Sequence, residues 1–231
     1  MKASDPSRQA VIFDFDGVMV DTESYHAEAW EITFRNQGLA VTWEQCFPAV
    51  ELEDHVFVTA VLQDLGIKAD PREWVREKQA VFRQLLDQIK VYPGVVELVQ
   101  ALTLKYPLAI VSSAWTENIN TLIHQVGLKS HFSVIVGKET VSVHKPAPDG
   151  YLKAAELLKL PPSNCVVLED SPSGIRSAKA AGMKCIGVAH RQNPEQLQEA
   201  DHVVPNLVNT QNLLQLLNHH PSKFRNSTGD I

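Results

Sequence analysis

Val11-Ile12-Phe13-Asp14-Phe15-Asp16-Gly17-Val18 is the stretch around which this 231-residue sequence is organised. A short apolar run that ends at a glycine is typical of a buried strand in a parallel sheet. Side chains two residues apart point the same way in an extended chain, so we expect Asp14 and Asp16 to leave the strand end together. Neighbouring carboxylates repel each other and need a proton, a cation or separation, which makes this strand end a candidate reactive site. The plainer alternative is a turn, because Asp and Gly are common turn residues.

The bulk composition limits the class of protein. With 44% hydrophobic residues, a chain of this length can bury one large core and still carry a smaller insert. The net charge is -6 and there is no basic stripe, so nucleic acid is not an expected partner. We find no apolar run of the signal-peptide or membrane-spanning type, and we expect no membrane partner.

The three cysteines, Cys46, Cys165 and Cys185, are too few and too scattered for a disulfide framework or a zinc site. Cys165 and Cys185 lie in apolar runs and are expected to be reduced core residues. This cysteine usage favours a cytoplasmic location. A monomer is our expectation for the oligomeric state.

Strand and helix patterns alternate along most of the chain. The first strand is expected at 11–15, and the later strands are expected at 108–111, 133–136, 165–168, 185–188 and 202–204. The helices expected between and after them are at 95–105, 116–126, 149–158, 173–181 and 207–217. Such alternation predicts βαβ units and a parallel sheet that helices cover on both faces.

The segment that follows the first strand has a different pattern. Helices are expected at 23–36, 51–65 and 71–88, and no convincing strand lies among them. An all-helical stretch therefore separates the first strand from the rest of the sheet. The polar tail at 219–231 is expected to be disordered.

Polar residues follow several of the predicted strands. The carboxyl ends of parallel strands meet at one edge of a sheet, and this edge is where open α/β folds bind ligands. The residues that the strands and their loops deliver there are Asp14 and Asp16, Ser112 and Ser113, Lys145, and Glu169 with Asp170. Each signal is weak alone, because such residues also cap helices, form turns or stay solvated. Their convergence at one edge predicts a functional site.

The residue types suit phosphoryl transfer. Asp14 can attack phosphorus to form an aspartyl-phosphate, and Asp16 can protonate the leaving oxygen and then take a proton from water. Ser112 and adjacent backbone N–H groups can hold phosphate oxygens, while Lys145 supplies positive charge near the transferring group. The expected cofactor is Mg²⁺, which prefers oxygen ligands. The candidate metal ligands are Asp14, Asp16, Glu169 and Asp170.

These motifs resemble, in order and over nearly the whole chain, those of the haloacid dehalogenase superfamily. The likeness is closest to its branch of sugar-phosphate phosphatases and β-phosphoglucomutase. The segments that carry it are Asp14-Phe15-Asp16-Gly17-Val18, Ser112, Lys145-Pro146-Ala147-Pro148-Asp149 and Glu169-Asp170-Ser171-Pro172-Ser173-Gly174-Ile175.

The resemblance implies an α/β fold, with a Rossmann-like parallel sheet core and a small all-helical cap inserted after the first strand. The implied core comprises residues 1–22 and 91–218, and the implied cap is 23–90. In that family the first Asp is the nucleophile and the second is the acid/base. Its Mg²⁺ is bound by the first Asp, the backbone carbonyl of the second Asp and the last Asp.

The match to the mutase branch is incomplete at the positions with which that branch recognises its substrate. The mutase branch usually carries a Gly followed by a cap Arg that grips a distal phosphate, and this sequence has Ala49 and Leu52 there. It also tends to carry a Lys shortly after the strand-end Ser, where this sequence has Ala114-Trp115. These differences favour hydrolysis over isomerisation. Trp115 either lines the entrance or, as is more usual for an aromatic after a strand, packs into the core.

Two residues of the implied cap, His26 and Lys78, match positions that the mutase branch uses, and we include them as candidate substrate-binding residues. The alternatives are a surface helix histidine for His26 and a solvated helix charge for Lys78.

The function expected from the sequence is an Mg²⁺-dependent phosphatase acting on a small phosphomonoester, with a sugar phosphate as the favoured substrate. A phosphoglucomutase-type isomerase is the main alternative. A dehalogenase is disfavoured, because haloacid dehalogenases proper lack the carboxylate found here at Asp16. A catalytically silent binding module is disfavoured because buried acids without a role are costly.

Overall fold

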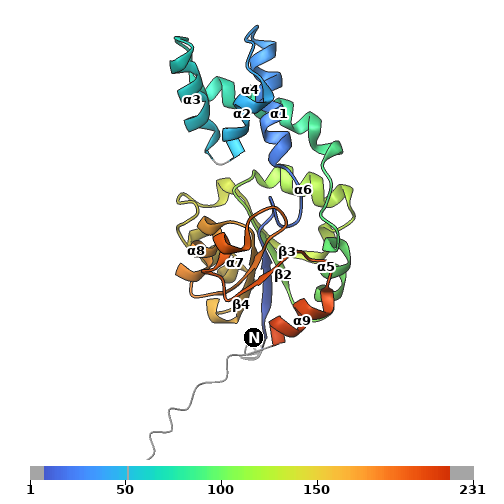
Figure 1. Cartoon of the computed structure of the whole chain (residues 1–231). Coiled ribbons are helices and arrows are strands. Elements are labelled where there is room, and N and C mark those ends of the chain that lie inside the picture. The colour runs from blue at the N-terminus through green and yellow to red at the C-terminus, as the bar shows by residue number, and fades with distance from the viewer. Residues whose placement is uncertain (1–7, 51, 219–231) are drawn as a thin grey trace, which may run out of the picture.

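The structure is a computed structural model that describes residues 8–50 and 52–218. Figure 1 shows a part built on a sheet with a group of helices stacked beyond one end of it. The strands are β1 (Ala10–Phe13), β2 (Leu108–Val111), β3 (Phe132–Val136), β4 (Cys165–Glu169), β5 (Lys184–Val188) and β6 (His202–Val204). The α-helices are α1 (Glu23–Asn36), α2 (Trp43–Cys46), α3 (Asp54–Asp64), α4 (Pro71–Leu85), α5 (Val95–Thr103), α6 (Thr116–Gln125), α7 (Asp149–Leu158), α8 (Pro172–Ala180) and α9 (Thr210–Asn218). The 3-10 turns are η1 (Phe47–Val50), η2 (Leu86–Gln88), η3 (Lys129–His131), η4 (Lys138–Thr140), η5 (Pro162–Asn164) and η6 (Pro194–Leu197).

The six strands pair in parallel in the order β3-β2-β1-β4-β5-β6. The chain runs outward from β1 through β2 to β3 and then returns to the other side of β1 with β4. Strand order therefore reverses at β1, which is the place where open α/β sheets bind ligands. The predicted α/β fold with a parallel sheet is confirmed.

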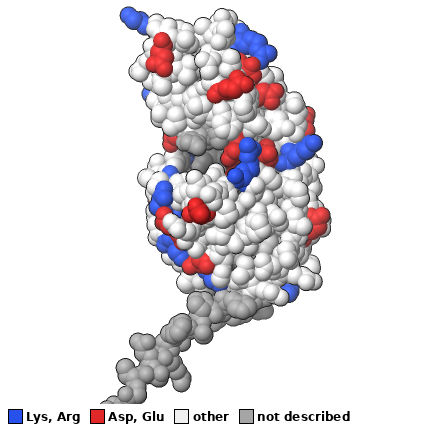
Figure 2. Space-filling view, in the orientation of Figure 1, with Lys and Arg blue, Asp and Glu red and all other residues white. Residues whose placement is uncertain are grey.

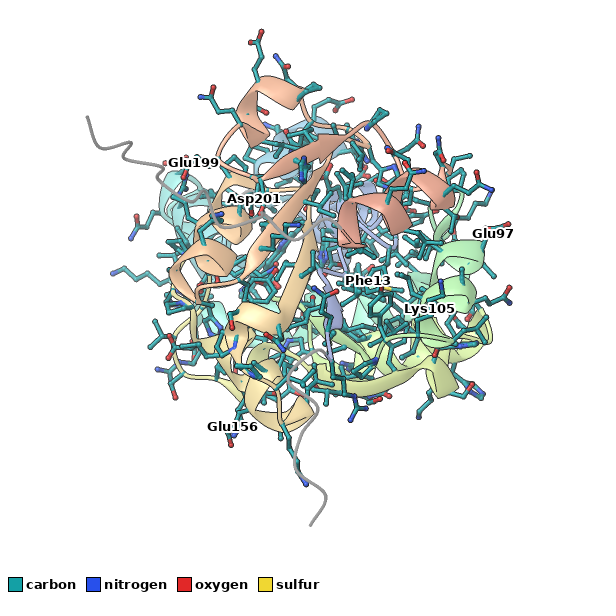
Figure 3. All side chains as sticks on the ribbon, turned by 90° about the horizontal axis from the view of Figure 1, so that it is seen from below. Phe13, Glu97, Lys105, Glu156, Glu199 and Asp201 are labelled. Atoms are coloured by element: carbon teal, nitrogen blue, oxygen red, sulfur yellow. The ribbon has the colours of Figure 1, made fainter. Side chains whose placement is uncertain are left out.

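Alternate residues of each strand enter two separate apolar cores. Phe13 faces the core that α5, α6 and α9 complete, whereas Ile12 faces the core that α7 and α8 complete. In Figure 3, Phe13 lies in the middle of the packed side chains, while Glu97 and Glu156 lie at the rim. With both faces covered, only the ends of the strands remain for a site.

The helices α1 to α4, with η1 and η2, form a group that we call the helical insert (residues 23–88), and it has its own apolar core. Trp30 packs on Phe57 with ring centroids 5.4 Å apart, and Phe34 packs on Trp74 at 5.3 Å. In Figure 1 the insert lies beyond the end of the sheet rather than on either of its faces.

Several element boundaries differ from those predicted. The first strand, expected at 11–15, ends at Phe13 because the chain turns at Gly17, which has a φ of 86°. The helix expected at 51–65 begins at Asp54 and follows two short helices, which are too short to show a helical period. The helix expected at 207–217 begins at Thr210, because Leu207 is buried in the core ahead of it.

The predicted disordered tail at 219–231 lies outside the described residues. Within the described ranges, no helix combines the length and the apolar composition that crossing a membrane requires.

Candidate active site

Asp14 and Asp16 leave the end of β1, but different partners hold them. The Asp14 side chain is almost fully buried. The Asp16 carboxylate accepts hydrogen bonds from the Thr22 hydroxyl at 2.7 Å and from the Ser112 hydroxyl at 2.8 Å. Ser112, predicted to hold phosphate, therefore also orients Asp16, and its Oγ accepts a further hydrogen bond from a backbone N–H.

The ends of β1 and β4 bring three buried carboxylates together. Asp14, Glu169 and Asp170 each place one oxygen within 4.8 Å of the others. The Lys145 ammonium, from the loop before α7, donates to Asp14 and to Glu169, the latter at 2.6 Å. The convergence of these four residues at one sheet edge is what the sequence predicted.

Glu169 differs from Asp14 and Asp170 because both of its carboxylate oxygens accept hydrogen bonds from protein groups. One accepts from Lys145 and from the Tyr151 hydroxyl at 3.1 Å, and the other accepts from the backbone and hydroxyl of Ser171 at 2.8 and 3.0 Å. Glu169 is also fully buried, whereas Asp14 and Asp170 line an open cleft. These contacts favour a supporting role, in which Glu169 positions Lys145, over the metal ligation predicted for it.

The electrostatics of this cluster show a deficit of positive charge. Burial raises the pKa of Asp14 to about 8, with Glu169 adding to the effect and the Lys145 ammonium opposing it. Burial, with the charges of Glu169 and Asp14, also raises the pKa of Asp170 well above its usual range. Burial disfavours the Lys145 ammonium, but Asp14 and Glu169 outweigh this and hold its pKa well above normal. Buried oxygen donors with excess negative charge fit a hard divalent cation such as Mg²⁺.

The cluster forms one end of a cleft of about 620 Å³ between the sheet edge and the helical insert. Figure 2 shows the surface hollowed at this junction. Asp14, Asp16, Lys145 and Asp170 line the cleft, together with the predicted residues Ser113 and His26. Three predicted residues, Ser112, Lys78 and Glu169, are not among the described residues that line it.

The interpretation of Lys78 as a solvated helix charge is wrong, because the side chain is 0% exposed. Its ammonium donates to both oxygens of Asp54, at 2.8 and 3.1 Å, and contacts His26 Nδ1 at 2.8 Å. His26 stacks on Phe82 with ring centroids 4.3 Å apart, so it is not a free surface histidine either. Burial and the Lys78 charge lower the pKa of His26 to about 4, so a neutral imidazole faces the cleft.

Lys78→Met is expected to destabilise the protein by about 3 kcal/mol, because it leaves Asp54 largely buried without its cation. Lys68→Met, at an exposed position of the insert, is the matched control and is expected to change stability by less than about 0.5 kcal/mol. Urea unfolding of both variants checks the prediction. Equal midpoints for the two variants would contradict it.

Sequence reasoning missed Thr22, Asp54 and Tyr151 as members of the site. Thr22 and Asp54 lie at helix starts, where Thr and Asp are expected as caps, and Tyr151 lies on an amphipathic helix, where it is expected in the core. Their partners are far away in sequence, so no local pattern points to them. Of the two alternatives given for Trp115, the structure supports the first, because this residue lines the cleft and does not pack into the core.

Gly17→Ala is expected to abolish most activity. A Cβ at Gly17 would lie 1.9 Å from an Asp170 carboxylate oxygen, and the φ of +86° adds backbone strain. Gly38→Ala is the matched control, because Gly38 has a φ of +75° with nothing within 4 Å of the added carbon. Both variants should lose about 1 kcal/mol of stability from strain, but only Gly17→Ala should lose about 100-fold or more in kcat/KM. Similar kcat/KM values for Gly17→Ala and Gly38→Ala would show that activity does not depend on the position of the Asp170 carboxylate.

This fold and this grouping of carboxylates with a lysine define a known class of enzyme. The family model described as haloacid dehalogenase-like hydrolase matches residues 11–188. The chain belongs to this family, and the resemblance noted from its motifs is confirmed.

Two relatives and one solved structure show the level of similarity. Fructose-1-phosphate phosphatase YqaB of Escherichia coli is 32% identical over 179 residues, covering 77% of this chain and 95% of the relative. A phosphorylated carbohydrates phosphatase of Thermotoga maritima is 32% identical over 216 residues, covering 90% and 98%. The crystal structure of CbbY from Rhodobacter sphaeroides in complex with phosphate superposes with a TM-score of 0.77 at 26% identity, covering 87% of this chain and 96% of that one.

Proposed function

We propose that the chain is an Mg²⁺-dependent phosphatase that hydrolyses a small phosphomonoester, a sugar phosphate in the favoured case, through an aspartyl-phosphate at Asp14. The observation that carries this proposal is the contact of buried Asp14 with Lys145, beside Asp170, at the floor of an open cleft. The phosphatase names of two relatives support the reaction class.

In the first half of the reaction, an Asp14 oxygen attacks phosphorus and the bond from phosphorus to the leaving oxygen breaks. Asp16 gives its proton to that oxygen, and the Thr22 and Ser112 hydroxyls fix its orientation. In the second half, water attacks the same phosphorus and Asp16 takes a proton from the water. Inorganic phosphate and free Asp14 are the products. Lys145 offsets negative charge at Asp14 throughout.

Asp14 and Asp170, with the backbone carbonyl of Asp16 that the family resemblance implies, would hold the metal. When bound, Mg²⁺ supplies charge neutralisation for the phosphoryl oxygens and favours the ionised form of Asp14. The helical insert serves in this proposal as the cap, residues 23–90, that covers the cleft and excludes bulk water.

Incubation of the protein with a hexose 1-phosphate and Mg²⁺ tests the proposal. We expect inorganic phosphate and free hexose, with no hexose 6-phosphate. Appearance of the 6-phosphate would identify a mutase instead, and halide release from a haloacid would identify a dehalogenase. If no phosphorylated compound in a broad panel is turned over and Mg²⁺ does not bind, the chain is a binding module.

We also propose that the protein acts as a monomer in the cytoplasm. Its three cysteines are unpaired and buried, which supports a reducing compartment. Sedimentation of the full chain tests the oligomeric state.

A further inference from the structure

The chain crosses between the sheet and the helical insert twice, and the two crossing segments lie side by side. The first crossing, at 20–22, leads from the end of β1 into α1, and the second, at 89–92, leads from η2 back towards α5. Val20 and Val91 form an antiparallel bridge between them. The covalent connection of the insert to the sheet is thus one narrow pair of segments.

The loop that follows β5 contacts both crossings. The Arg191 guanidinium donates to Asp21 Oδ1 at 2.6 Å, and its Nε lies 3.4 Å from a carboxylate oxygen of Glu23. The neighbouring His190 ring stacks on Tyr92 of the second crossing, with the ring centroids 4.0 Å apart and the planes 7° apart. A loop at the end of the fifth strand therefore holds the connection to the insert from outside.

The first crossing also carries a hydrogen-bond donor to the proposed general acid. The Thr22 hydroxyl donates to the Asp16 carboxylate at 2.7 Å. In the chain, Thr22 lies between the two carboxylate residues that Arg191 contacts. A threonine side chain is stiff at χ1, so the position of its hydroxyl follows the backbone that carries it. A shift of the first crossing would therefore move a group that orients Asp16.

The ion pair of Arg191 with Asp21 acts from outside the cleft. Neither residue is among the described residues that line the cleft, so a direct contact with the substrate is not its role. The two side chains are 38% and 41% exposed. An exposed ion pair changes an equilibrium by about fivefold at most, which sets the size of the effect to expect from its removal.

We infer that Arg191 is a positioning residue for the general acid: it holds the first crossing so that Thr22 keeps Asp16 directed at the leaving oxygen. His190, stacked on Tyr92, holds the second crossing against the same loop. This inference rests on the proposed phosphatase function and adds to it the part of the chain that fixes the acid/base in place.

The test compares phenyl phosphate with 4-nitrophenyl phosphate, two esters of similar shape. Phenolate is the more basic leaving group and needs a proton from the general acid, whereas 4-nitrophenolate leaves with little help. Arg191→Gln and Asp21→Asn should each lower kcat/KM for phenyl phosphate by about fivefold, and for 4-nitrophenyl phosphate by less than about twofold. The double variant should lose no more than Arg191→Gln alone, because both changes remove the same ion pair.

A second measurement serves any phosphomonoester that the wild-type protein hydrolyses. If Arg191 acts through the general acid, Arg191→Gln should lower kcat/KM by less than about twofold in an Asp16→Asn background. A loss of the same size in that background as in wild type would overturn the inference.

Arg35→Gln is the matched control, because Arg35 also forms an ion pair with a carboxylate, that of Glu31 at 3.4 Å, but in the last turn of α1. It should change kcat/KM for both esters by less than about twofold. Equal losses on the two esters in Arg191→Gln would overturn the inference, because they would mark a structural role. If wild-type protein hydrolyses phosphomonoesters and Arg191→Gln changes no kcat/KM, the inference fails while the proposed function stands. If wild-type protein hydrolyses none, the proposed function fails and the inference with it.

Discussion

Asp14→Asn should reduce kcat by at least about 10⁴-fold, because the amide cannot attack phosphorus to form the phosphoenzyme. The fold should persist, since Lys145 keeps its 2.6 Å contact with Glu169 in the absence of the Asp14 carboxylate. The substitution also replaces a carboxyl whose ionised form is disfavoured by burial, which raises its pKa to about 8, with a neutral amide of nearly the same size. Initial rates of phosphate release, with circular dichroism of the same samples, measure both effects.

Asp64→Asn is the matched control for this loss, because Asp64 ends α3 at an exposed position. Its activity should stay within about twofold of wild type. Retained turnover in Asp14→Asn would contradict the assignment of the nucleophile.

The second large effect concerns the metal. Asp170→Asn should lower activity at millimolar Mg²⁺ by about 10²–10³-fold, because it removes a buried carboxylate oxygen from the cluster with Asp14. Chelation of Mg²⁺ from the wild-type protein should abolish activity, and re-addition of the ion should restore it.

Thermal melting gives a readout of this metal site that is independent of turnover. Mg²⁺ should raise the Tm of the wild-type protein and of Asp64→Asn, since a ligand that binds only the folded state stabilises it. The rise should be absent or much smaller in Asp170→Asn. An equal rise in all three proteins would show that the ion binds elsewhere.

The sequence predicted those parts of the site that follow from strand order. Asp14, Lys145 and Asp170 are adjacent to apolar strands or their loops, and parallel strands bring such ends to one edge. The strand limits were less predictable, because a turn such as that at Gly17 depends on backbone conformation rather than on hydrophobic period.

Local sequence patterns could not predict contacts between side chains that lie far apart in the sequence. The burial of Lys78 follows from its pairing with Asp54, which lies 24 residues away on another helix. Charged side chains on amphipathic helices are normally exposed to solvent. This general rule led to the wrong prediction of a solvated environment for Lys78. Likewise, the four hydrogen bonds to Glu169 are visible only once Tyr151 and Ser171 are placed around it.

The most direct test is to trap the phosphoenzyme. Asp16→Asn is incubated with acetyl phosphate as the phosphoryl donor. The phosphoenzyme should form, because the acetate leaving group needs little protonation, and it should be hydrolysed slowly, because the general base Asp16 is missing. After acid quench, mass spectrometry should find one phosphoryl group on the peptide that contains Asp14, removable by hydroxylamine and absent in Asp14→Asn. If wild-type protein releases phosphate but the Asp14 peptide carries that group at no quench time, either in wild type or in Asp16→Asn, covalent catalysis at this residue is contradicted.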